Sequence, residues 1–215
     1  MKSKIIVGCI LLAVFVLWTA AVCIVDVQPI GPNDSGVGFA TINGYVHDLT
    51  GVNLDLYNLT DWLSLIPVAV VMGFGLLGLR QWIQRKSLWK VDGSILALGI
   101  FYLVVGAVFL FFENVVINYR PVLIEGVLEA SYPSSTTMLV LCVMGSAGVQ
   151  IRQRIQNPVL RWCVILAISV FTAFMVAGRL LSGVHWLSDI IGGGLLSVGL
   201  IALYDAAAKE WQIYI

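Results

Sequence analysis

Three short segments carry most of the side chains in this 215-residue chain that are capable of chemistry. They are Asn118-Tyr119-Arg120-Pro121, then Tyr132-Pro133-Ser134-Ser135-Thr136-Thr137, and then Gly178-Arg179 continuing to His185 and Asp189. Together they supply two guanidinium groups, a run of hydroxyls, an imidazole and a carboxylate. Guanidinium groups hold phosphate oxygens through paired hydrogen bonds and stay charged at any workable pH. The set therefore indicates a site for an anion.

The remaining side chains suit the same site. Pro133 fits the first position of a helix, where free N–H groups attract an anion and the hydroxyls of Ser134, Ser135 and Thr136 add donors. His185 and Asp189 are four residues apart, so in a helix beginning near His185 the carboxylate orients the ring as a nucleophile. Taken alone, the hydroxyl cluster is also typical of a plain helix cap, and His185 of an interfacial histidine. Their convergence on one side of the membrane, argued below, favours a site.

The elements that must position these residues are membrane-spanning helices. The chain is 60% hydrophobic and 11% charged, more apolar than a soluble domain of this length. Long runs of roughly 20 apolar residues without alternation predict helices that cross a hydrocarbon core of about 30 Å. We expect an all-α, polytopic bundle forming a single membrane domain over residues 1–215, with an external loop at 26–60 that includes a short amphipathic piece near Leu54 to Trp62. The six predicted spans lie near 5–25, 61–80, 93–114, 134–150, 159–178 and 188–205.

The basic residues predict the orientation. The first span resembles a signal peptide, but its length favours a retained anchor. Lysines and arginines cluster at both ends of the chain and in alternate loops, which places both termini in the cytoplasm and residues 26–60, 115–133 and 179–187 outside a plasma membrane. Only Arg120 and Arg179 break this pattern. An anionic ligand explains them, and interfacial snorkelling is the alternative.

Composition also limits the partners. The formal net charge is zero and no basic face is dense enough for nucleic acid, so the expected partners are the bilayer and a lipid substrate. The four cysteines lack metal-ligand spacing, and we expect neither metal nor cofactor. The small residues Gly192, Gly193, Gly194 and Ser197 permit close helix packing, either inside the bundle or between protomers, so the oligomeric state stays open.

The three segments resemble the type 2 phosphatidic acid phosphatases (PAP2), membrane lipid phosphatases related to vanadium haloperoxidases. That family's pattern is Lys, six residues, Arg-Pro; then Pro-Ser-Gly-His; then Ser-Arg, five residues, His, three residues, Asp. The resemblance spans residues 113–189, and its third part is the most specific. There Arg179, His185 and Asp189 match in register, with Gly178 in place of Ser.

The resemblance implies a metal-independent, two-step phosphoryl transfer. His185 is the expected nucleophile that forms a phosphohistidine, and Asp189 holds its tautomer. Phosphate oxygens are expected to bind Arg120, Arg179, Ser134, Ser135 and Thr136 at the helix start.

Two positions depart from the pattern. Glu113 stands where the family has Lys, and either pairs with Arg120 or simply ends the third span. Thr136 stands where the family has the histidine that protonates the leaving oxygen. General acid catalysis typically accelerates a reaction by about 10²–10⁴-fold, and a threonine hydroxyl is too weak an acid to supply it. The sequence therefore favours a substrate whose leaving group departs as a stable anion and needs no proton.

The sequence therefore predicts an enzyme that hydrolyses a lipid phosphate or diphosphate on the outer face of the plasma membrane, with undecaprenyl diphosphate as the preferred substrate in cell wall synthesis. One alternative is a phosphatase of phosphatidate or phosphatidylglycerophosphate. The other is a PAP2-like protein that binds lipid phosphate headgroups without turnover.

Overall fold

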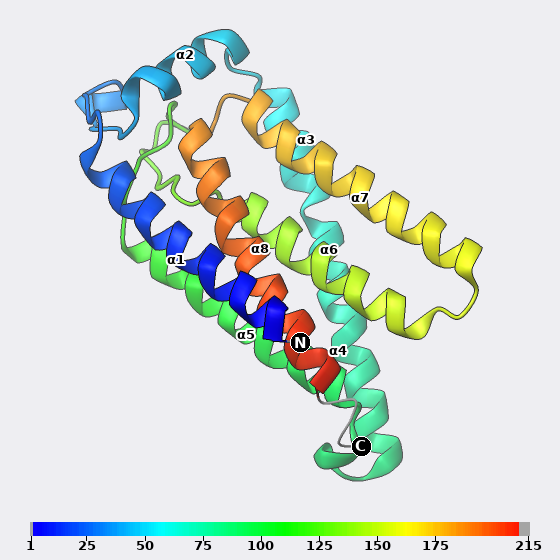
Figure 1. The fold of residues 1–215 in the computed structure, drawn as a ribbon. Helices are drawn as coiled ribbons and strands as arrows, with labels where there is room; N and C mark the ends of the chain where they lie inside the picture. Colours follow the sequence, from blue (N-terminus) through cyan, green and yellow to red (C-terminus); the bar gives the residue numbers. More distant parts are fainter. Residues whose placement is uncertain (1, 211–215) are drawn as a thin grey trace.

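The computed structural model describes residues 2–210, which form a bundle of helices without a β-strand (Figure 1). This all-α architecture confirms the predicted fold class. The α-helices are α1 (Lys2–Ile24), α2 (Ala40–Thr50), α3 (Leu54–Leu63), α4 (Leu65–Arg85), α5 (Gly93–Asn114), α6 (Ser135–Arg154), α7 (Pro158–Leu181) and α8 (Leu187–Glu210).

Helix α6 lies at the centre of the bundle. Five segments within residues 2–210 are long and apolar enough to cross a membrane: α1, α3 with α4, α5, α7 and α8. Helix α6 falls outside that set, although it is 20 residues long and lies among them. It packs against α4, α5, α7 and α8, and 11 of its residues are buried. Neighbouring helices rather than lipid surround much of its length, so its sequence needs less apolar character.

The segment predicted as an external loop at 26–60 contains two helices instead. Helix α3 coincides with the expected amphipathic piece, and the side chain of Asn53 caps it by accepting a hydrogen bond from the N–H of Leu56 at 2.9 Å. The next helix, α4, begins only at Leu65, after a break at Ser64, rather than at residue 61. Helix α2 had no signal in the sequence, and it lies across one end of the bundle (Figure 1).

Close packing fixes α8 within the bundle. Helix α1 runs along α8, and Gly199 allows their close approach, since an added Cβ would lie 3.0 Å from the side chain of Leu12. Further along α8, a Cβ on Gly192 would lie 2.6 Å from the ring of Tyr132. Gly192 therefore packs inside the bundle, against another segment of the same chain, rather than between protomers.

The two ends of the bundle differ. The end that carries α2 also carries residues 115–134 and 182–186, which contain the candidate site residues Arg120, Ser134 and His185 (Figure 1). At the opposite end, the carboxylate of Asp92, just before α5, accepts hydrogen bonds from Gln81 at 2.8 Å and Arg85 at 2.9 Å on α4 and from Arg154 at 3.2 Å on α6. The three segments singled out in the sequence therefore meet at one end of the molecule.

Candidate active site

Helix α6 starts at the site with a serine cap. Ser134 is buried, and its Oγ accepts a hydrogen bond from the N–H of Thr137 at 3.4 Å. The helix begins at Ser135, so Pro133 precedes the cap and does not occupy the first helical position. The free N–H groups of this first turn give the site a positive helix end.

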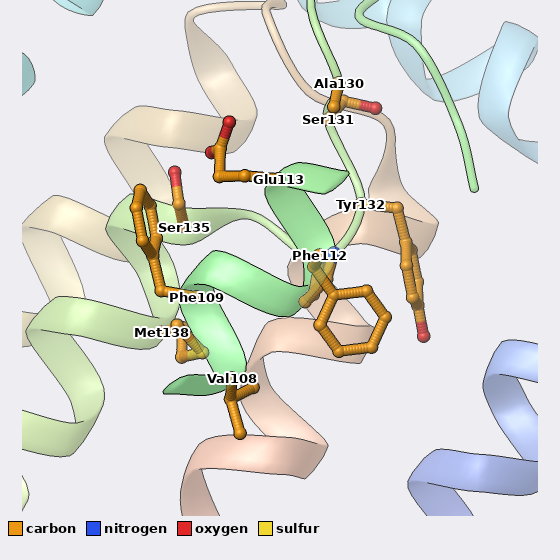
Figure 2. A pocket seen from close by; sticks show the side chains of 10 residues that line it. Val108, Phe109, Phe112, Glu113, Ala130, Ser131, Tyr132, Ser135 and Met138 are labelled. Carbon is orange, nitrogen blue, oxygen red and sulfur yellow. The ribbon is translucent and has the colours of Figure 1, made fainter. Parts of the chain in front are cut away.

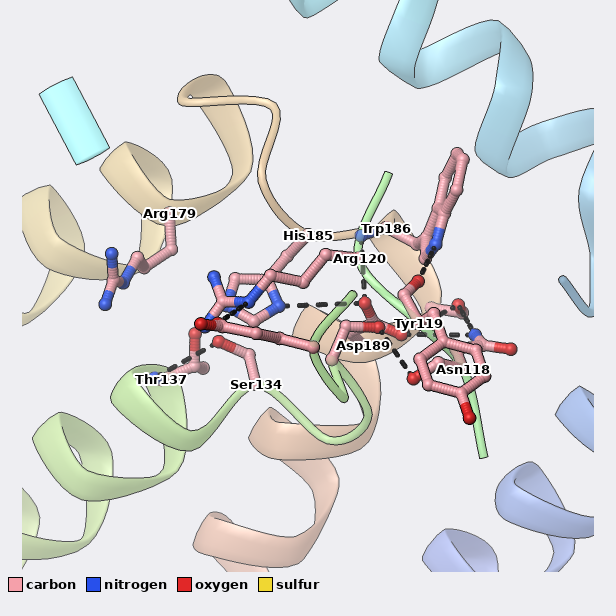
Figure 3. Close-up of polar contacts among 12 residues, drawn as sticks. Asn118, Tyr119, Arg120, Ser134, Thr137, Arg179, His185, Trp186 and Asp189 are labelled. Carbon is pink, nitrogen blue, oxygen red and sulfur yellow. Dashed lines mark hydrogen bonds and ion pairs between the residues drawn. The ribbon is translucent and has the colours of Figure 1, made fainter. Parts of the chain in front are cut away.

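Asp189 ties the three sequence segments together. Its carbonyl oxygen accepts a hydrogen bond from the N–H of Ser134 at 3.1 Å. Its carboxylate accepts one from the side chain of Asn118 at 3.2 Å and another from the N–H of Trp186 at 2.9 Å (Figure 3). The side chain is fully buried, so these donors replace the water that a carboxylate would otherwise require.

His185 lies beside this carboxylate. Its Nδ1 is 3.7 Å from Oδ2 of Asp189, its side chain is 1% exposed, and within residues 2–210 neither ring nitrogen has a hydrogen-bond partner. Burial lowers the pKa of His185 to about 4, and the nearby charges of Arg120 and Arg179 act in the same direction, against Asp189. The ring is consequently neutral at pH 7, the state in which a nitrogen lone pair is free.

Arg179 is held on one side by several acceptors. Its Nη2 is 3.0 Å from Asp61 and also donates to the hydroxyl of Thr136, while its Nη1 donates to the hydroxyl of Thr60 and the carbonyl of Tyr57, both at 3.4 Å. The side chain is 2% exposed, and its Nε has no partner among the described residues. One donor of this buried guanidinium is thus left for a ligand.

Arg120 is held by a carboxylate that the sequence analysis did not single out. Its Nε lies 2.9 Å from Glu129, and its backbone N–H donates to the carbonyl of the same residue at 3.0 Å. Its Nη1 is buried and has no hydrogen-bond partner in the part of the chain that the structure describes. The suggested ion pair with Glu113 is wrong, because Glu113 is exposed in the last turn of α5 and Glu129 occupies that role.

Ser135 and Glu113 lie together at a neighbouring pocket. Figure 2 shows both side chains at one edge of a cavity of about 10 Å³, roughly the space of one water molecule. Ser135 has no hydrogen bond to Arg120, Arg179 or His185. The structure therefore separates Ser135 and Glu113 from the group that surrounds the imidazole.

An apolar groove leads from the site into the membrane region. It has a volume of about 380 Å³ and runs between α4, α5 and α6. Ser135 and Thr136 line one part of it, and Val68, Val105 and Gly106 line another. A chain of methylene groups can lie in such a groove while a polar headgroup stays at the helix start.

Sequence reasoning missed the residues that hold the two arginines. Tyr57, Thr60 and Asp61 come from α3, and Glu129 comes from the loop before α6. The one available signal was general: a buried arginine needs an acceptor, and Glu129 falls in a predicted external segment while Asp61 directly follows another. Within residues 2–210, no three His, Cys, Asp or Glu side chains gather as they would around a metal ion.

The site therefore brings together most of the predicted residues. His185 and Asp189 are adjacent, the charges of Arg120 and Arg179 act on the imidazole, and Ser134 and Thr136 stand at the start of α6 (Figure 3). Three residues of this group, Arg120, Arg179 and His185, carry buried nitrogens that find no hydrogen-bond partner among residues 2–210. The arrangement suits a tetrahedral anion beside a nucleophile.

Comparisons with known proteins agree with this reading of the fold. The chain is similar to a crystal structure described as that of the first transmembrane PAP2 type phosphatidylglycerolphosphate phosphatase from Bacillus subtilis, with a TM-score of 0.62 and 17% identity over 94% of this chain and 96% of that chain. No curated protein gives a significant match. A family model described as the PAP2 superfamily matches residues 65–211, more than half of the chain. The chain therefore belongs to the PAP2 superfamily.

Proposed function

We propose that this protein hydrolyses a lipid diphosphate on the outer face of the plasma membrane through a phosphohistidine at His185, with undecaprenyl diphosphate as its substrate. The observation that carries the proposal is the set of unpaired buried nitrogens on Arg120, Arg179 and His185. Leaving such groups unsatisfied costs about 1–3 kcal/mol each, or more for a charged group, and a bound phosphate group would satisfy them.

The geometry supports a two-step transfer. In the first step, Nε2 of His185 attacks phosphorus as the bond to the leaving oxygen breaks. Asp189 stabilises the positive charge that develops on the ring, while Arg120 and Arg179 bind the equatorial oxygens. In the second step, water attacks the phosphohistidine, the phosphorus–nitrogen bond breaks, and inorganic phosphate leaves.

Thr136 supports a diphosphate substrate. Its hydroxyl accepts a hydrogen bond from Arg179, and it is too weak an acid to protonate a departing alkoxide. A polyprenyl diphosphate expels a phosphate monoester, which departs as a stable anion. The rate of hydrolysis of this substrate should therefore fall little when the histidine that acts as general acid in the family is absent.

The apolar groove supports a lipid as the substrate. Gly106 lines the groove, and a Cβ added there meets no atom within 4 Å, so the substitution Gly106→Leu adds apolar bulk at the groove wall. We expect it to raise the KM for a long-chain lipid phosphate and to spare a short-chain one. Gly99→Leu on the same helix is the matched control, since Gly99 lines a different groove and also has open space around it.

A second candidate follows from the similar Bacillus subtilis structure, whose description names a phosphatidylglycerolphosphate phosphatase. That substrate, like phosphatidate, expels an alkoxide and would gain from a general acid. A third candidate is a lipid phosphate binder without turnover, which the departures at Glu113 and Thr136 favour. The neutral imidazole of His185, which lies beside Asp189, favours catalysis over binding alone.

One assay distinguishes these candidates. Phosphate release by the purified protein is measured from undecaprenyl diphosphate, phosphatidylglycerophosphate and phosphatidate, beside His185→Ala and the control His47→Gln. We expect the highest kcat/KM on the diphosphate, full loss in His185→Ala, and normal rates in His47→Gln. Faster release from phosphatidate would overturn the substrate assignment, and equal rates in wild type and His185→Ala would leave only binding.

A further inference from the structure

Helix α3 docks directly on α7 beside the site. Gly178 makes this approach possible, because a Cβ at that position would lie 2.7 Å from Cγ2 of Thr60 and 3.7 Å from Leu56. Thr60 is fully buried in this contact. The glycine at position 178 thus allows α3 to reach the neighbouring Arg179.

The contact brings the ring of Tyr57 to both arginines. The guanidinium carbon of Arg179 lies over the ring at 4.8 Å from its centroid, and that of Arg120 at 5.7 Å. The carbonyl of Tyr57 also accepts a hydrogen bond from Arg179 at 3.4 Å. Tyr57 is half-buried, and its ring makes a cation–π contact with each of the two arginines.

Two like charges at one site repel each other until an anion arrives. Asp61 and Glu129 offset part of this repulsion, but both are partly exposed, at 59% and 40%, so water screens their effect. The face of an aromatic ring carries negative electrostatic potential and attracts a guanidinium without forming a hydrogen bond. The ring therefore attracts both groups without using any of their N–H donors.

We propose that Tyr57 is a positioning residue that fixes Arg120 and Arg179 in the geometry that receives the phosphate group. The proposal rests on the phosphate site described above, and it adds a residue from outside the family's three motif segments. The ring face does this work, and the hydroxyl is not required. Catalysis by His185 then depends on α3, which reaches the site from a different part of the chain.

The test is the affinity for orthovanadate, a mimic of the transferred phosphoryl group, measured by calorimetry on the purified full-length protein. Tyr57→Phe and Tyr57→Trp keep a ring face, and we expect both to bind vanadate within about twofold of the wild type. Tyr57→Leu keeps apolar bulk but loses the face, and we expect about tenfold weaker binding, the scale of a desolvated cation–π contact. Tyr45→Leu on α2 is the control, because Tyr45 is exposed and should have no effect.

The KM and kcat of the same variants provide a second readout. Tyr57→Leu should raise the KM for the lipid diphosphate by a similar factor, and Tyr57→Phe should not. Wild-type affinity in Tyr57→Leu overturns the proposal, and so does equal weakening in Tyr57→Phe and Tyr57→Trp, which would assign the effect to the hydroxyl. Should Tyr57→Leu fail to fold, Tyr57→Met, which also lacks a ring face, takes its place with the same expected loss. A wild type that binds vanadate but releases no phosphate from any lipid would refute the proposed hydrolysis and leave the comparison of Tyr57 variants intact.

Discussion

At the scale of single residues, Thr136 is the most informative departure from the PAP2 motif. The resemblance assigns its position to a histidine acid, yet the threonine hydroxyl instead accepts a hydrogen bond from Arg179. Compared with the motif, an acidic group is replaced by a hydroxyl that contacts Arg179, the side chain that we propose binds phosphate. Such an exchange suits a substrate whose leaving group needs no proton.

The substitution Thr136→His should widen the substrate range. We expect it to raise the ratio of phosphatidate to diphosphate hydrolysis by about tenfold or more, because the added imidazole can protonate an alkoxide. The control Thr136→Val loses the contact with Arg179 without gaining an acid, and should lower both rates alike. A ratio unchanged in Thr136→His would contradict the account of the leaving group. Phosphate release from the two lipids measures both effects.

His185 should titrate well below an ordinary histidine. Burial lowers its pKa to about 4, whereas an unfolded chain takes up the proton near 6.5. Folding stability should consequently fall as the pH drops from about 6.5 toward 4, and His185→Gln should flatten this dependence. Nitrogen NMR on the His47→Gln variant, which retains one histidine, checks the pKa directly. A ring already protonated at pH 6 would refute the assignment.

At the scale of elements, the sequence predicts where the long helices lie but not which helices contact each other. Long apolar runs predicted a helix in each of six regions, since the pattern that signals a span is local. The docking of α3 on α7 was not predictable, because Thr60 and Gly178 are far apart in sequence and their contact depends on tertiary packing. For the same reason the sequence indicated Arg179 but not Tyr57, Thr60 or Asp61.

Restoring the family's serine at position 178 should disturb this docking. Gly178→Ser places a Cβ against Cγ2 of Thr60, and we expect a loss of about 1–3 kcal/mol in stability together with weaker vanadate binding. Thr60→Ser removes that methyl group but keeps the hydroxyl that contacts Arg179. The double variant should therefore recover most of both losses in thermal unfolding and calorimetry. Simple additivity of the two substitutions would show that the close contact is not the cause.

At the scale of the whole molecule, the chain places its chemistry at one end of the bundle. The predicted topology put the three segments on one side of the membrane, and the structure brings them together at one end through Asp189. Basic side chains at the other end serve partly in packing, as the contacts of Arg85 and Arg154 with Asp92 show. Which end faces the cell exterior stays a prediction from the distribution of lysine and arginine.

Labelling of single cysteines tests this orientation. The native cysteines are first replaced, and a membrane-impermeant maleimide is then applied to intact cells. We expect labelling of Tyr45→Cys on α2, and labelling of Ser87→Cys, between α4 and α5, only after permeabilisation. The reverse pattern would place the candidate site in the cytoplasm and refute an extracytoplasmic activity.

The central claim is that His185 itself bonds to phosphorus, and trapping the intermediate tests it most directly. The protein is mixed with a lipid diphosphate that carries a radioactive terminal phosphate, and the reaction is quenched in alkali, in which phosphohistidine survives. We expect the label on the peptide that contains His185, its absence in His185→Ala, and its retention in His47→Gln. Turnover without label on His185, or label that persists in His185→Ala, would contradict the account.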